Sequence, residues 1–120
     1  MFKIIFYKDS KGNEPVKEYL LKLKERSQTS KQDRIQFTKI NAYIRSLQEY
    51  GTRIGNPTVK HIEGDIWELR PLSNRIFFFY WKDDTFVLLH YFHKKTQKTP
   101  VKEIAKAKHH MKDFKERTCK

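Results

Sequence analysis

The chain has 120 residues and a formal net charge of +12, from 26 Lys and Arg against 14 Asp and Glu. That length suits one domain, spanning residues 1–120. The hydrophobic fraction of 38% and the aromatic fraction of 14% argue against a disordered tail. The charge exceeds the roughly 2–8 units that solubility requires. It therefore predicts a polyanionic partner: nucleic acid, an anionic membrane face or an acidic protein.

The cellular setting follows from cysteine content and hydropathy. The one cysteine, Cys119, has no partner for an intrachain disulfide, which fits a reducing cytosol. Residues 1–11 alternate apolar and basic side chains and do not form the apolar core of a signal peptide. The longest apolar run, Ile76–Trp81, is far shorter than the roughly 20 residues of a membrane-spanning helix. We expect a cytoplasmic protein that does not bind membranes.

The first half of the chain predicts one strand and two helices. Residues 2–7 are β-branched and aromatic and run into a turn cluster, as strands do. Pro15 suits the first turn of a helix, where its missing N–H costs little. Ser30 is a candidate N-cap for a second helix that would end at Gly51. The apolar stripe of the first helix has helical spacing: Val16, Tyr19, Leu20 and Leu23.

The second half predicts strands joined by short turns and then a last helix. Polar or glycine-containing turns separate strands at 66–70, 75–81 and 85–93, and a short segment at 58–62 is a further candidate strand. Pro100 opens the last helix after a basic loop. Hairpin-linked strands form antiparallel sheets. The prediction is thus an α+β domain, a small antiparallel sheet packed with two N-terminal helices and one C-terminal helix.

Positive charge gathers in the C-terminal quarter. From residue 90 onward there are ten Lys and Arg and three acids, so ten minus three leaves +7 of the total +12. A solvated helix face is the simple interpretation. Part of this charge, however, lies at a strand end, where Lys94 and Lys95 follow the last strand and a cation can be held in a fixed position.

Two further cations flank the turn between neighbouring strands. Alternation places Arg70 on the face of Glu68, and it places Arg75 on the face of Phe77 and Phe79. Both faces of the 75–81 strand are aromatic. One face meets the helices, and the other is either core or a platform for bases, where stacking contributes about 1–3 kcal/mol per base.

Three segments taken together resemble a known family. Ile66–Arg70, Asn74–Tyr80 and Leu88–Pro100 carry a Glu-Leu-Arg…Arg…Phe-x-Lys-Lys-Thr order. This pattern resembles the RelE/ParE superfamily of bacterial toxins, and within it the HigB branch, which includes phage-derived members. The resemblance implies a microbial ribonuclease fold over nearly the whole chain.

The same resemblance implies a function and partners. The expectation is the toxin of a type II toxin–antitoxin system, which cleaves mRNA on the translating ribosome. A HigA-like antitoxin with a helix-turn-helix region would neutralise it, in a toxin–antitoxin heterotetramer. Two alternatives stay open: a gyrase inhibitor like the ParE branch, and a basic nucleic-acid-binding module without catalysis.

RNA cleavage without a metal needs a base for the 2′-hydroxyl, a cation for the phosphorane and an acid for the leaving 5′ oxygen. Carried over by position, Arg75 would stabilise the phosphate and the transition state, with Lys95 or Lys94 as the C-terminal cation. Arg70 either grips a phosphate or has a structural role, pairing with a carboxylate such as Glu68 of a neighbouring molecule or strand.

His93 is the candidate base, since imidazole has an unperturbed pKa near 6.5 and neighbouring cations keep it neutral. A packed histidine or a deprotonated lysine is the alternative. RelE-type enzymes often have a tyrosine after the basic loop, but here that region is Thr99–Val101. Tyr80 or Tyr91 would have to supply the hydroxyl. Four residues are predicted to bind RNA: Lys98, Phe77, Phe79 and Lys102.

No metal or cofactor is expected. His90 and His93 fall on opposite faces of a strand, and His109 and His110 diverge by about 100° on a helix. Neither pair sits in a cysteine or acid cluster with zinc-ligand spacing. The four glycines do not form a nucleotide-binding fingerprint.

Overall fold

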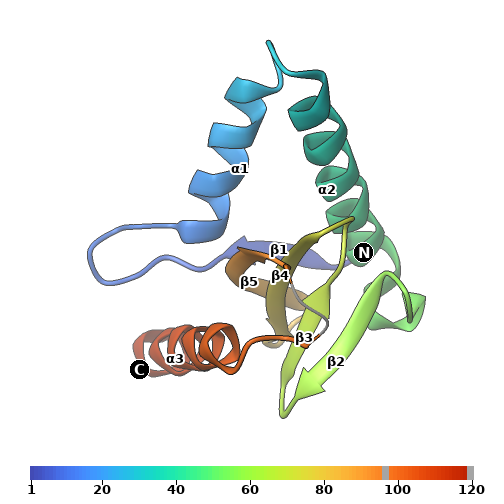
Figure 1. Cartoon of the computed structure of the whole chain (residues 1–120). Coiled ribbons are helices and arrows are strands. Elements are labelled where there is room, and N and C mark those ends of the chain that lie inside the picture. The colour runs from blue at the N-terminus through green and yellow to red at the C-terminus, as the bar shows by residue number, and fades with distance from the viewer. Residues whose placement is uncertain (96–97, 119–120) are drawn as a thin grey trace.

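The computed structural model describes residues 1–95 and 98–118, and it is an α+β fold (Figure 1). A five-stranded sheet carries three α-helices and one short 3-10 helix, η1. Cys119 lies outside the described residues. The elements in chain order are β1 (Lys3–Phe6), α1 (Pro15–Arg26), α2 (Lys31–Tyr50), η1 (Gly51–Ile54), β2 (Val59–Glu63), β3 (Ile66–Leu69), β4 (Asn74–Tyr80), β5 (Thr85–His93) and α3 (Val101–Thr118).

The helix ends lie where local sequence signals predict them. Pro15 is the first residue of α1. The Ser30 hydroxyl accepts a hydrogen bond from the backbone N–H of Asp33 at 3.2 Å, which caps α2. Gly51 ends α2 with a φ of 65°, a conformation that a side chain disfavours.

The sheet has the order β1-β5-β4-β3-β2 and is mixed rather than wholly antiparallel. Strands β2 to β5 form antiparallel pairs, as hairpins require. The prediction is wrong for β1, which pairs with β5 in parallel, with Lys3 opposite Thr85. The chain leaves β1 through two helices before it re-enters the sheet at the far edge, so no tight turn fixes the direction of β1.

Helices cover both faces of the sheet. Figure 1 shows α1 and α2 (blue to green) over one face and α3 (red) on the other. Strand alternation divides β4 between two cores, with Phe78 facing α1 and α2 and Phe79 facing α3. The α1–α2 core also contains Leu20, Leu23, Ile40, Ile44 and Leu47, and the α3 core also contains Phe77, Leu89, Phe92, Ala107 and Phe114.

A bulge in β5 changes which side chains face α3. Phe77 lies opposite His90, but Phe78 lies opposite Leu88, so Leu89 is an extra residue. As a result Leu89 packs in the α3 core, and the neighbouring His90 also reaches α3, where its Nε2 donates to Glu103 at 2.6 Å. Desolvation lowers the pKa of His90 below its ordinary value.

Within the described ranges, no helix has the length and apolar character that crossing a membrane demands.

Candidate functional site

A buried carboxylate stands at one end of the sheet. Glu68, in β3, is fully shielded from solvent and lies opposite Lys60 of β2 and Phe77 of β4. A buried charge of this kind needs compensating partners. The nearest partners are two arginines on the same face, Arg70 and Arg75.

Both guanidinium groups approach the same carboxylate oxygen. Glu68 Oε1 is 3.4 Å from the Nε of Arg70 and 3.7 Å from the Nε of Arg75. Both carboxylate oxygens and both Nε atoms are buried, and none makes a hydrogen bond to the described residues. The ion pairs therefore balance charge but leave hydrogen-bonding capacity unused.

Arg75 is largely enclosed and braces the turn before β4. Its Nη1 donates to the carbonyls of Leu72, at 2.7 Å, and Asn74, at 2.8 Å. Leu72 has a φ of 59°, so these bonds hold a turn that a side chain disfavours. Burial lowers the pKa of Arg75, Glu68 opposes that shift and Arg70 adds to it.

Lys94 completes the arrangement from the end of β5. Its backbone N–H donates to the Ser73 carbonyl at 2.8 Å, which fixes the strand end beside the turn. Burial lowers the pKa of the Lys94 amine, and Arg75, Arg70 and Lys60 lower it further against the opposing effect of Glu68.

We call these five residues the cation cluster: Lys60, Glu68, Arg70, Arg75 and Lys94. Four cations against one carboxylate give it a net charge of +3. Such a group can hold a phosphate, and its crowding favours loss of a proton from the lysine with the depressed pKa.

The remaining predicted cations lie further out. Lys95 is exposed just after Lys94, and Lys98 and Lys102 are exposed on either side of Pro100, the residue before α3. The structure thus brings Arg70, Arg75 and Lys94 together but leaves these three lysines at the surface.

The predicted base platform is wrong. Phe77 and Phe79 have no exposed surface, because α3 packs over this face of the sheet. The Phe77 ring lies 5.3 Å from that of Phe92, and the Phe79 ring lies 5.9 Å from that of Phe114. Their rings are core and offer no face to a nucleic-acid base.

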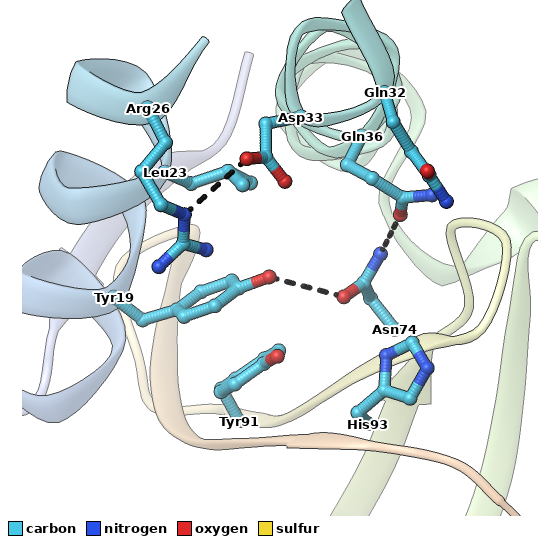
Figure 2. Close-up of a pocket in the computed structure, with 9 residues that line it drawn as sticks. All are labelled: Tyr19, Leu23, Arg26, Gln32, Asp33, Gln36, Asn74, Tyr91 and His93. Carbon is cyan, nitrogen blue, oxygen red and sulfur yellow. Dashed lines mark hydrogen bonds and ion pairs between the residues drawn. The ribbon is translucent and has the colours of Figure 1, made fainter. Parts of the chain in front are cut away.

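His93 lies on the other face of the sheet from the cation cluster. It is paired with Asn74 across β4 and β5, and it lines a pocket between α1, α2 and the strand ends (Figure 2). Its imidazole is therefore separated from the cluster by the sheet.

Neither tyrosine proposed as the hydroxyl donor joins the cluster. Tyr91 stacks on Tyr19 in the pocket of His93, with ring centroids 3.5 Å apart. Tyr80 is exposed near the opposite end of β4, where its hydroxyl accepts a hydrogen bond from the Asp84 N–H.

Glu68 belongs to the cluster but was not among the catalytic residues predicted from the sequence. Its signal was present, as a lone acid between apolar strand residues with an arginine two positions later on the same face. Its complete burial places it at the centre of the cluster, and that burial depends on residues distant in the sequence, such as those of the paired strands β2 and β4, so it is not a local property.

A comparison with known protein families identifies the family of the chain. Residues 19–112 match the family described as phage derived protein Gp49-like (DUF891). The chain belongs to the Gp49-like family. This is a RelE/HigB-like toxin family associated with toxin–antitoxin systems. Among curated proteins, no sequence matches the chain significantly.

In the part of the chain that the structure describes, no group of three or more His, Cys, Asp or Glu side chains could hold a metal ion.

Proposed function

We propose that this Gp49-like protein is the toxin of a type II toxin–antitoxin system and acts as a ribosome-dependent mRNA endonuclease of the HigB type. The observation that carries the proposal is the cation cluster, in which Arg70 and Arg75 pair with one buried carboxylate and two lysines lie near them at the ends of neighbouring strands. The family match supports the toxin class.

The cluster suits the charge that develops during RNA cleavage. Attack of the 2′ oxygen on phosphorus, with loss of its proton to a base, forms an anionic phosphorane. Breaking the bond to the 5′ oxygen, which takes up a proton from solvent, then gives a 2′,3′-cyclic phosphate and a 5′-hydroxyl end. Cations held in advance stabilise that anion without reorganisation. The Arg70 side chain is 24% exposed and that of Arg75 is 11% exposed, so Arg70 has more surface for direct phosphate contact.

Lys94 is the group best suited to take the 2′-hydroxyl proton. A lowered amine pKa increases the neutral fraction at a given pH, and the neutral amine is a base. Arg75 then acts mainly by holding the turn and adding to the positive field around Lys94. This assignment replaces His93 as the base.

Partners follow from the same chemistry. A chain of net charge +12 suits ribosomal RNA as a docking platform and mRNA as a substrate in the cytoplasm. We propose a HigA-like helix-turn-helix antitoxin as the neutralising partner, in a heterotetramer.

The first test is controlled expression in a bacterial host, with growth and mRNA 5′ ends as readouts. Wild type should arrest growth and produce new 5′ ends within translated regions. Arg70→Ala and Lys94→Ala should restore growth and remove those ends. The matched controls Arg45→Ala and Lys22→Ala change exposed helix residues outside the cluster and should stay toxic.

Arrest with intact mRNA and altered plasmid supercoiling would contradict the proposal and assign gyrase as the target. Salt-dependent RNA binding without arrest or cleavage would also contradict it, and would indicate a binding module.

A further inference from the structure

A polar pocket lies behind the cation cluster, on the α1–α2 face of the sheet. It has a volume of about 230 Å³, smaller than the roughly 300–1,000 Å³ of pockets for drug-sized ligands. A single planar ring system fits that scale. Figure 2 shows its lining side chains, which come from α1, α2 and the ends of β4 and β5: Tyr19, Leu23, Arg26, Gln32, Asp33, Gln36, Asn74, Tyr91 and His93.

One wall of the pocket is rigid. Asn74 is 1% exposed, and its amide nitrogen donates to Gln36 Oε1 and to the Pro71 carbonyl. Its carbonyl oxygen accepts from the Tyr19 hydroxyl at 3.2 Å, and the Tyr19 ring stacks on Tyr91. This network fixes the side chains before any ligand arrives.

Other groups in the pocket are unused. Within the described residues, the Gln32 amide, the Gln36 amide nitrogen and the His93 imidazole make no hydrogen bond. Amides and imidazole rings present hydrogen-bonding groups in a plane, which is how proteins read the edges of nucleobases. Gln32 and His93 are exposed, so their polar groups are open to a ligand beside the hydrogen-bonded Asn74 wall, and convergent polar groups of this kind are typical of a ligand site.

The pocket and the cation cluster share two strand ends. Asn74 and Arg75 are neighbours in β4 and point to opposite faces, and His93 and Lys94 do the same at the end of β5. A single RNA strand that passes over these strand ends would meet the cluster on one face of the sheet and the pocket on the other.

We infer that this pocket binds one unstacked nucleobase of the RNA substrate and sets the base preference beside the cleaved bond. The inference rests on the proposed function, since it assigns the pocket to the same substrate. A side chain of a protein partner is the competing occupant. The pocket's two charged side chains, Arg26 and Asp33, pair with each other at 3.4 Å, and its unused groups are the planar amides and imidazole, which favours a base.

The direct test titrates the full-length protein with adenosine, guanosine, cytidine and uridine, which lack the phosphate that the cluster would hold. Side-chain amide NMR signals of Gln36 and Asn74 report on the pocket, and the backbone signal of Lys94 reports on the cluster. One nucleoside should shift the pocket signals at millimolar concentration and leave the Lys94 signal less affected.

The variant Gln32→Leu should weaken that binding about five- to tenfold, the loss expected for one hydrogen bond. Gln28→Leu, an exposed glutamine outside the pocket, is the matched control and should bind as wild type does. If all four nucleosides leave the pocket signals unmoved, or if Gln32→Leu binds as tightly as wild type, the inference is overturned. If the antitoxin shifts the NMR signals of the pocket and no nucleoside does, the inference is overturned in favour of a protein partner.

Cleavage mapping separates this inference from the proposed function. Gln32→Leu should still cut mRNA but with altered base preference beside the cut, whereas Lys94→Ala should not cut yet should still bind the nucleoside. Unchanged base preference in Gln32→Leu contradicts the pocket assignment alone. Absence of cleavage by wild type contradicts the proposed function, and the nucleoside titration still decides the pocket.

Discussion

At the residue scale, the proposed cleavage site depends on the single carboxylate of the cation cluster, Glu68. Glu68 is fully buried, and Arg70 and Arg75 both approach its Oε1. A buried ion pair contributes little net stability, but removing one partner leaves an uncompensated charge and is costly. Glu68 therefore allows the four cations of the cluster to lie close together at the end of the sheet.

Replacing Glu68 with alanine should lower the free energy of unfolding by about 3–5 kcal/mol, the usual effect of stranding a buried charge. Urea denaturation measures this loss. Glu25→Ala, at an exposed position of α1, is the control and should stay within about 0.5 kcal/mol of wild type. A similar small change in Glu68→Ala would show that the carboxylate does not hold the cluster.

The depressed pKa of Lys94 sets the direction of the pH dependence. The neutral amine is the active form, so the cleavage rate should rise as pH increases from about 6 to 9, below the ordinary lysine pKa of about 10.4. Lys94→Arg keeps the charge but stays protonated, so it should abolish cleavage rather than shift its profile. Single-turnover rates across this pH range make the measurement. A flat wild-type profile, or an active arginine variant, would exclude Lys94 as the base.

At the scale of elements, local signals predicted most of the fold. Pro15, Ser30 and Gly51 mark helix ends through their own backbone chemistry, and turn residues separate the later strands. The parallel pairing of β1 has no local signal, because it depends on where the chain returns after two helices. For the same reason the aromatic pattern of β4 showed two apolar faces but could not show that α3 closes over Phe77 and Phe79.

Gly51 offers a matched test at this scale. A Cβ at Gly51 would lie 2.8 Å from the Phe2 ring, whereas a Cβ at Gly12 would meet nothing within 4 Å, and both glycines have positive φ. Gly12→Ala measures backbone strain alone, about 1 kcal/mol. Gly51→Ala adds the clash and should destabilise the protein more in thermal unfolding. An equal loss of stability in both variants would show that the Phe2 ring moves aside without destabilising the protein.

At the scale of the whole molecule, the proposed function assigns RNA affinity and RNA cleavage to different surfaces. The exposed lysines from Lys95 onward carry diffuse charge, whereas the cation cluster holds a few charges in fixed positions. Diffuse charge binds a polyanion through the release of counterions, so its effect depends on salt. This division between diffuse and fixed charge could be predicted from the sequence, because both the run of C-terminal lysines and the cations at the strand ends can be recognised there.

Removing one exposed lysine should weaken RNA binding and flatten its salt dependence. For Lys102→Ala, the slope of log affinity against log salt should decrease by about 0.7, the value for one contact with a single strand. Fluorescence anisotropy with a short labelled RNA at several salt concentrations gives the slope. An unchanged slope would place Lys102 outside the RNA contact.

The central claim is that the cation cluster cleaves mRNA on the ribosome. The most direct measurement is a reconstituted translation reaction with purified ribosomes and one defined mRNA, followed by mapping of RNA ends. We predict cuts within the translated region by wild type without added antitoxin, and intact mRNA with Lys94→Ala. Equal cutting by both proteins, or intact mRNA with an active wild-type toxin, would contradict the claim.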